Sequence, residues 1–177
     1  MKPTIDPKKL FIQSNQRNCG IAVIRSIRSN IENSQFSEND IFKGFTNEGL
    51  VRINGPNIND IKNYWKNLFP QYEHQTEDDQ NIDDIEIMFN KGFFAMVICN
   101  SFANIFHCIL YLGLKNNYVG YWDPFPTRGT LIKKREEFDN LRRHDNPMHF
   151  REIHYVRSHE NFLGLLIKEG PLSVVTL

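Results

Sequence analysis

In the first half of the chain, apolar residues recur every three or four positions, the spacing of a helix with one buried face. The clearest segment is CGIAVIRSIRSNIENS, residues 19–34, where these positions hold Val23 or Ile24, Ile27 and Ile31. Asn15 or Asn18 can cap its first turn. This pattern predicts an amphipathic helix that begins at the cysteine.

Three further segments before residue 93 have helical spacing: residues 36–45, 54–69 and 81–92. In the second, a turn precedes the helix and Asn57 or Asn59 can cap it. Gly92 ends the third. Pro3 and Pro7 make residues 1–12 an irregular lead-in.

After residue 92 the pattern changes to short apolar runs rich in strand-forming residues. These runs cover residues 93–100, 106–114 and 116–124, with 149–158 as a further candidate and 161–170 ambiguous between strand and helix. A Lys-Asn-Asn turn suited to a hairpin joins the second run to the third. Helices followed by an antiparallel sheet predict the α+β class, and the length suits a single domain over residues 1–177.

Composition and charge narrow the possible partners. Twenty-one basic residues balance twenty-one acidic ones, which removes the electrostatic argument for a nucleic-acid partner. No apolar stretch approaches the roughly 20 residues that span a bilayer, and the first residues lack the apolar region of a secretory signal. We expect no nucleic acid and no membrane partner, in a protein that is cytoplasmic or secreted by a signal-peptide-independent route. The oligomeric state is left open.

Cysteine and histidine spacing bears on disulfide and metal chemistry. The three cysteines contain no CxxC pair, which argues against a disulfide framework and a zinc ribbon. Cys99 and Cys108 are interpreted as core residues. The spacing of four histidines fits neither a helix face nor an HExxH site: His144, His149, His154 and His159. We interpret these histidines as surface or strand-edge residues and expect no metal ion and no cofactor.

Cys19 is the candidate nucleophile. The first turn of a helix carries unpaired backbone N–H groups and the positive end of the helix dipole, and both stabilise a thiolate. Gly20, which follows at once, would let a substrate approach closely. The alternative is a small buried side chain, the usual state of a free cysteine.

His107 and Asp123 are its candidate partners. His107 stands at the start of one predicted hairpin strand and Asp123 at the end of the next, so the hairpin brings both to the same end of the sheet. An aspartate there can fix one imidazole nitrogen and leave the other facing the thiol. Taken singly, each residue has a more ordinary explanation, as a strand-start histidine or a turn-forming Asp-Pro.

Gln13 is the candidate oxyanion donor. Acyl transfer to a thiolate passes through a tetrahedral oxyanion that needs preorganised donors. The glutamine lies six positions before Cys19, and the loop between them allows its amide to fold back beside the sulfur, next to the Cys19 backbone N–H. Gln16 is a rival with less room to turn back. A loop glutamine without a role is the default alternative.

The stretch QSNQRNCGIAVI resembles the start of the double-glycine leader peptidases of bacteriocin exporters, a branch of the papain-like cysteine peptidases. The resemblance continues through residues 54–69, the strand FFAMVICN, the His107 strand, the terminal Asp-Pro and the short helix EEFDNL. It is clearest over residues 10–140. It implies a papain-like fold, with Cys19 as nucleophile, His107 as general base and acid, Asp123 as orienting residue and Gln13 as oxyanion donor.

In the exporters, this domain begins a longer chain with membrane spans and an ATPase. No membrane segment or GxxxxGK[ST] loop occurs here, so we expect a free-standing cysteine peptidase acting on a peptide or protein. Residues 145–177 have no counterpart that we can align. Two alternatives stay open: a bacterial effector or toxin that is a glutamine deamidase or acyltransferase with the same triad, and a non-catalytic peptide-binding module.

Overall fold

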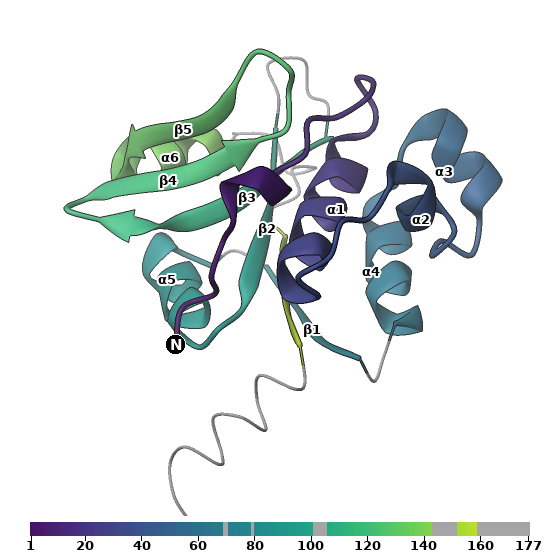
Figure 1. Cartoon of the computed structure of the whole chain (residues 1–177). Coiled ribbons are helices and arrows are strands. Elements are labelled where there is room, and N and C mark those ends of the chain that lie inside the picture. Colours follow the sequence, from purple (N-terminus) through teal and green to yellow (C-terminus); the bar gives the residue numbers. More distant parts are fainter. Residues whose placement is uncertain (69–70, 79, 101–105, 143–151, 159–177) are drawn as a thin grey trace, which may run out of the picture.

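The computed structural model describes residues 1–68, 71–78, 80–100, 106–142 and 152–158. Within them the helices are the 3-10 turn η1 (Pro7–Lys9), α1 (Cys19–Ile31), α2 (Glu38–Phe42), α3 (Glu48–Asn54), α4 (Ile58–Asn67), α5 (Ile82–Asn90) and α6 (Arg135–Arg142). The strands are β1 (Tyr72–Glu77), β2 (Phe94–Asn100), β3 (Phe106–Lys115), β4 (Tyr118–Asp123), β5 (Gly129–Lys134) and β6 (Ile153–Ser158). They form an antiparallel sheet in the order β1-β6-β2-β3-β4-β5 (Figure 1), which confirms the α+β class.

Each face of the sheet has its own apolar core. Helices α1 to α4 cover one face, and α5 and α6 cover the other (Figure 1). Along β2, Phe94, Met96 and Ile98 belong to the first core, whereas Ala95 and Val97 belong to the second. Successive side chains of a strand point to opposite faces, so a strand between two helical layers is apolar at every position. This explains why the β2 segment shows no polar alternation.

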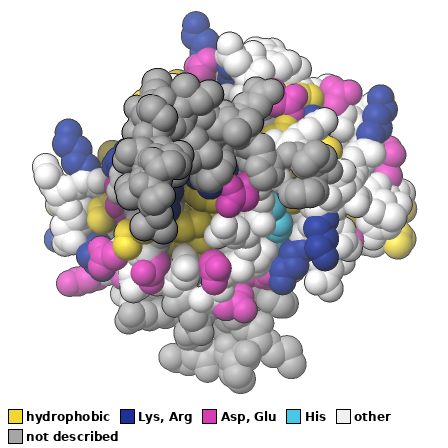
Figure 2. All heavy atoms as spheres, turned by 90° about the horizontal axis from the view of Figure 1, so that it is seen from below, with side chains coloured by type: hydrophobic (Ala, Val, Ile, Leu, Met, Phe, Trp, Pro, Cys, Tyr) yellow, Lys and Arg dark blue, Asp and Glu magenta, His cyan; other side chains and the backbone are white. Residues whose placement is uncertain are grey.

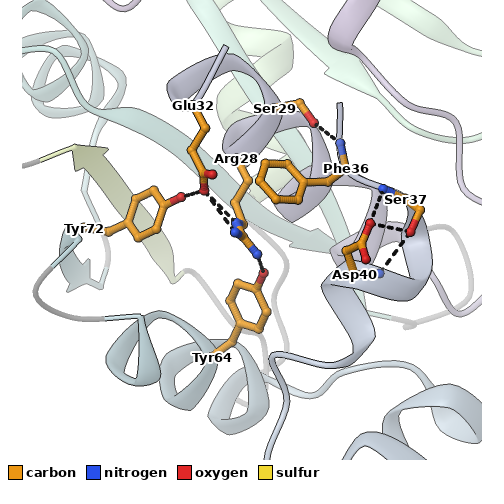
Figure 3. Close-up of polar contacts among 8 residues, drawn as sticks. All are labelled: Arg28, Ser29, Glu32, Phe36, Ser37, Asp40, Tyr64 and Tyr72. Carbon is orange, nitrogen blue, oxygen red and sulfur yellow. Dashed lines mark hydrogen bonds and ion pairs between the residues drawn. The ribbon is translucent and has the colours of Figure 1, made fainter. Parts of the chain in front are cut away.

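A polar cluster holds the C-terminal end of α1 against α4 and β1 (Figure 3). Arg28 donates to the hydroxyl of Tyr64 at 3.0 Å and to the carboxylate of Glu32 at 3.0 Å. The hydroxyl of Tyr72 donates to the same carboxylate, and the Arg28 guanidinium lies 4.0 Å from the centre of the Phe36 ring. These contacts come from three elements and fix α1 in position.

Three helices begin with a capping box. In each, the N-cap side chain accepts a backbone N–H bond from the third helical residue, whose acidic side chain accepts from the N-cap N–H. The pairs are Ser37 with Asp40 in α2 (Figure 3), Asn57 with Asp60 in α4, and Asn81 with Asp84 in α5. Of the two caps predicted for α4, the structure therefore uses Asn57.

The predicted hairpin is formed by β3 and β4. Asn116 and Asn117 at its tip have φ angles of 50° and 66°, as a two-residue turn of the mirror-image type requires. Asparagine tolerates this left-handed region better than most residues. The register shifts between Tyr111 and Gly113, a bulge that the sequence did not predict.

Some elements differ from the predictions. Helix α3 and strands β1 and β5 were not predicted, and β6 lies between β1 and β2 in the interior of the sheet. His154 in β6 is fully buried, so its interpretation as a surface or edge residue was wrong. His144, His149, His159 and the ambiguous segment 161–170 lie outside the described residues. No helix in the described part of the chain has the length and apolar character to cross a bilayer.

Candidate active site

Cys19 is the first residue of α1, and Asn18 is its N-cap. The Asn18 side chain does not cap the helix; its amide donates to Ser14 at 2.9 Å and to Glu38 at 2.6 Å. The first N–H groups of α1 therefore lack a side-chain cap, and the helix dipole acts on a thiol that is only 3% exposed. This is the setting in which a cysteine becomes a thiolate.

The structure gives Gly20 a different reason from the one expected. A Cβ at this position would lie 2.9 Å from Cγ of Pro56 and 3.6 Å from Sγ of Cys108. Only the distance to Pro56 is too short for a side chain, so glycine here lets the segment before α4 pack closely against the start of α1. Gly55, next to Pro56, has a positive φ of 76°, and its Cα approaches the Arg17 carbonyl so closely that a Cβ would clash with it. Both glycines thus serve packing around the helix start.

His107 and Asp123 meet at one end of the β3–β4 pair. His107 Nε2 lies 2.9 Å from Oδ1 of Asp123. The Asp123 side chain is only 3% exposed and that of His107 is 12% exposed. Because Asp123 occupies Nε2, Nδ1 is the ring nitrogen left to face Cys19, with which His107 shares a side-chain hydrogen bond.

Asp123 has two further donors. The Phe125 N–H donates to Oδ1 at 2.9 Å, and Arg128 donates to Oδ2 at 3.0 Å. Burial alone raises the pKa of Asp123, but the hydrogen bond and charge of His107, followed by the Phe125 N–H and Arg128, bring it below its usual value. The carboxylate is thus held ionised and oriented. Sequence reasoning missed Arg128, which lies in the turn after the Asp-Pro with no periodic signal to mark it.

The pKa values of Cys19 and His107 shift in opposite directions. The largest effect on Cys19 is a hydrogen bond from Cys108, and with His107 it outweighs burial and holds the thiol pKa well below its usual value. Burial lowers the pKa of His107, but its bonds to Asp123 and Cys19 raise it to about 9. Near neutral pH, the two side chains therefore form a thiolate–imidazolium pair.

Cys108 is buried, as predicted, and its location also affects the pKa of Cys19. It lies on the face of β3 that packs against α1, in the same apolar core as Cys19. Cys99 lies in the core of the other face. Strand alternation predicts the face to which Cys108 points, but not which helix covers that face.

Gln13 is 5% exposed, whereas its rival Gln16 is exposed. The Gln13 N–H donates to the carbonyl of Pro124 at 2.9 Å, which ties this loop to the residue after Asp123. Its side-chain Nε2 donates to the carbonyl of Asn15 at 2.9 Å, and Oε1 is buried without a hydrogen-bond partner among the described residues. The amide therefore has a defined orientation, with its second N–H beside the one bound to Asn15.

The described residues contain no group of three or more His, Cys, Asp or Glu side chains placed to hold a metal ion. His74 and His154 lie side by side, with His74 Nε2 3.0 Å from His154 Nδ1. The neighbouring carboxylate of Glu152 pairs with Lys62 at 2.5 Å instead. The triad itself offers a thiol with a lowered pKa, an imidazole with a raised pKa and an oriented carboxylate.

No protein-family model matches the sequence, and no curated protein matches it significantly. Solved structures do match the fold. The peptidase domain of Streptococcus ComA, described as a bi-functional ABC transporter involved in a quorum sensing pathway, has a TM-score of 0.61 and 17% identity over 85% of this chain and 98% of that one. A double glycine motif protease from an AMS/PCAT transporter, in complex with its leader peptide, has a TM-score of 0.55 and 16% identity, covering 89% and 94%.

The peptidase domain of Streptococcus mutans ComA has a TM-score of 0.52 and 17% identity, with 84% and 98% covered. The chain has a papain-like peptidase fold. The three structures are the kind of exporter peptidase domain that the sequence resembles. In this papain-like fold the described residues place Cys19 at the start of α1 and His107 and Asp123 at the adjoining end of the sheet.

Proposed function

We propose that the protein is a cysteine-dependent peptidase whose nucleophile is Cys19. The observation that carries the proposal is the hydrogen-bonded series from Cys19 through His107 to Asp123, with the thiol at the start of a buried helix. A thiolate so placed is activated by its pKa and by its base together. The sheet and helix that bring the three together have a peptidase-domain fold, which supports hydrolysis of an amide.

In this mechanism the Cys19 thiolate attacks the carbonyl carbon of a peptide bond. The imidazolium of His107 then gives its proton to the leaving amine, and a thioester remains on the sulfur. Water then attacks the thioester carbon with His107 as base, and the carbon–sulfur bond breaks. The acyl product leaves as a carboxylic acid, while the Cys19 thiolate and the His107 imidazolium are restored. Asp123 keeps Nε2 of His107 occupied throughout and stabilises the imidazolium each time it forms.

The Cys19 N–H and the Gln13 amide are the proposed oxyanion donors. The N–H of a first helical residue has no partner within its helix. The Gln13 Nε2 has one hydrogen on the Asn15 carbonyl and a second that can be given to the oxyanion. Because Gln13 is held through its own backbone by Pro124, the amide costs little reorganisation when charge develops.

A peptide substrate is supported by one of the similar structures, a protease crystallised with a leader peptide. We propose that this chain, too, acts on a peptide or protein segment. A glutamine deamidase would use the same thiolate and the same acyl-enzyme, and so would an acyltransferase. No contact in the described residues favours either of these over hydrolysis of the chain.

The test uses wild type and Cys19→Ala with peptides that carry a double-glycine site, followed by intact-mass analysis. We expect wild type to give two fragments that together contain one added water, and the alanine variant to give none. A shift of about one dalton without fragments would indicate deamidation through the same acyl-enzyme. Full activity of the alanine variant would overturn the proposal, and matching circular dichroism spectra would show that both proteins are folded.

A further inference from the structure

We propose that Cys108 is a positioning residue for the nucleophile: its thiol donates a hydrogen bond to the sulfur of Cys19 and holds that sulfur beside His107. The inference rests on the proposed function, in which Cys19 is the nucleophile. It adds to the triad a hydrogen-bond donor from strand β3, which packs against the helix that begins with Cys19.

The packing of α1 on β3 brings the two sulfur atoms together. Cys108 is fully buried, and its Sγ lies 3.6 Å from the place where a Cβ of Gly20 would stand. A separation of 3.6 Å is an ordinary van der Waals contact, so the Cys108 sulfur packs directly against the residue that follows the nucleophile. Cys19 and Cys108 belong to one apolar core, and each thiol shifts the pKa of the other, that of Cys19 down and that of Cys108 up.

The chemistry decides which sulfur donates. A thiol has one hydrogen and its sulfur is a weak acceptor, whereas a thiolate only accepts. Burial, followed by the negative Cys19, raises the pKa of Cys108 well above its usual value. Cys108 therefore keeps its proton over the whole range in which Cys19 is ionised, and it donates to the thiolate.

The bond is stronger than a thiol donor would make in water. Hydrogen bonds to an ionised acceptor are about twice as strong as neutral ones. Water does not compete at a Cys108 side chain that is fully buried. The Cys108 backbone N–H has a smaller effect in the same direction, lowering the pKa of Cys19. Two adjacent residues of β3 thus hold the sulfur: Cys108 from its side chain and backbone, and His107 from its ring.

The chain offers a matched control. Cys99 is also buried, in the neighbouring strand β2, but it lies in the apolar core on the other face of the sheet. Replacing Cys99 or Cys108 by alanine removes the same buried sulfur atom and leaves a cavity of similar size. Cys99 lies directly opposite His107 in the β2–β3 pairing, so this control also includes any loss of packing against the histidine, whereas the proposed hydrogen bond to Cys19 is lost only in Cys108→Ala.

The experiment measures the rate of Cys19 alkylation by iodoacetamide from pH 4.5 to 9.5, with each cysteine followed by peptide mass spectrometry. The proteins are wild type, Cys108→Ala, Cys108→Ser and Cys99→Ala. In Cys108→Ala we expect the acid limb to move up by about one pH unit, so that the rate on that limb falls about tenfold. The serine variant has a hydroxyl donor and should restore the wild-type limb, and Cys99→Ala should keep it.

The outcomes separate this proposal from the proposed function. If wild-type Cys19 titrates as an ordinary thiol near pH 8.5, the nucleophile itself is wrong. If wild type has an acid-shifted limb that Cys108→Ala leaves in place, the nucleophile stands and the role of Cys108 is overturned. Equal shifts in the Cys108→Ala and Cys99→Ala variants would also overturn it. Should the alanine variant fail to fold, Cys108→Val supplies a non-donor of similar volume for the same comparison with serine.

Discussion

Among the described residues, one histidine-containing group with little exposure is charged and another is neutral. At one, His107 lies between Cys19 and Asp123, and its pKa is raised to about 9. At the other, His74 of β1 and His154 of β6 stack with their ring centres 5.3 Å apart. Burial, with a smaller effect of nearby lysines, lowers the pKa of His74 to about 4. Burial, His74 and Lys62 lower that of His154 to about 3.

Burial disfavours the charged form in both places, so it does not explain the difference. His107 has an ionised carboxylate and a thiolate as partners, which outweigh the loss of water. His74 and His154 have each other, and Lys62 holds the carboxylate of Glu152 at 2.5 Å while His154 lies 4.0 Å from it. In the view from below, a histidine side chain is visible at the surface next to Lys or Arg side chains (Figure 2). The groups that contact a buried histidine, and not the extent of its burial, therefore decide whether it is charged.

Removing the charged histidine should have the largest effect. Without an imidazolium, the pKa of Cys19 in His107→Gln should rise toward that of an ordinary thiol, about 8.5, at which the thiolate fraction at pH 6 is about 0.3%. Complete reversion would slow alkylation about 300-fold where wild-type Cys19 is ionised at that pH. Because Cys108 is still present in the variant, we expect slowing of more than about tenfold and less than this limit. His74→Gln is the matched control and should react at the wild-type rate. Similar slowing in both variants would mean that the two histidine sites do not differ as described.

The neutral pair should make the fold sensitive to acid. The unfolded chain protonates His74 near pH 6.5, whereas the folded chain does so only near pH 4, so the unfolded state binds more protons between these values. Stability is therefore highest above pH 6.5 and falls as the pH decreases. From pH 7 to 5 we expect this histidine to remove about 2 kcal/mol from the free energy of unfolding.

Urea unfolding of wild type and His74→Gln at pH 7 and pH 5 measures this contribution. The variant should lose less stability than wild type over the same interval, by about the amount assigned to one histidine. Carboxylates elsewhere titrate alike in both proteins and cancel in the comparison. An equal loss in the two proteins would show that the histidine of β1 is not held neutral.

Arg128 binds the carboxylate of Asp123, so replacing it tests how that carboxylate affects the charge of His107. In Arg128→Ala, Oδ2 of Asp123 loses its 3.0 Å donor, and the carboxylate acts more fully on His107. His107 should keep its proton to a higher pH, so the basic limb of activity, which we expect near pH 9 in wild type from the pKa of His107, moves upward. We also expect a several-fold lower rate because Asp123 is less well oriented, roughly the effect of one hydrogen bond to a charged group.

Arg128→Lys should keep most of this limb, because it retains the positive charge. Arg135→Ala is the matched control, since Arg135 pairs with an exposed aspartate, Asp83. It should leave both the rate and the pH profile unchanged. A basic limb that stays at the wild-type pH in Arg128→Ala would remove Arg128 from the site.

Local signals made much of this site predictable. The apolar spacing after Cys19 predicts α1, the asparagines of the β3–β4 turn predict the hairpin, and the hairpin predicts that His107 and Asp123 share one end of the sheet. The contact of Cys108 with Cys19 was not predictable in this way, because it depends on which helix covers β3. Arg128 is an ordinary turn residue until the fold places Asp123 beside it.

The same limit explains the elements that were missed. Strand β1 has the sequence YEHQTE, which contains few apolar residues and becomes a strand by pairing with β6, about eighty residues later in the chain. Because β6 also pairs with β2, His154 lies in the interior and not at an edge. Neither segment has a residue pattern that identifies its distant pairing partner. The contact between His74 and His154, which depends on the pairing of β1 with β6, could therefore not be predicted from the sequence.

The smallest expected effect concerns the lysines near the neutral pair. Lys66, exposed on α4, helps lower the pKa of His74. In Lys66→Met we expect that pKa to rise by ~0.3 units, since an exposed charge acts on its neighbours through water. NMR titration of the His74 ring protons measures the shift, with Lys134→Met in the opposite edge strand β5 as control. Added salt should abolish the difference between the variants while leaving most of the His74 shift in place, because that shift comes from burial. If salt instead returned the His74 pKa to its usual value, charge and not burial would be keeping this histidine neutral.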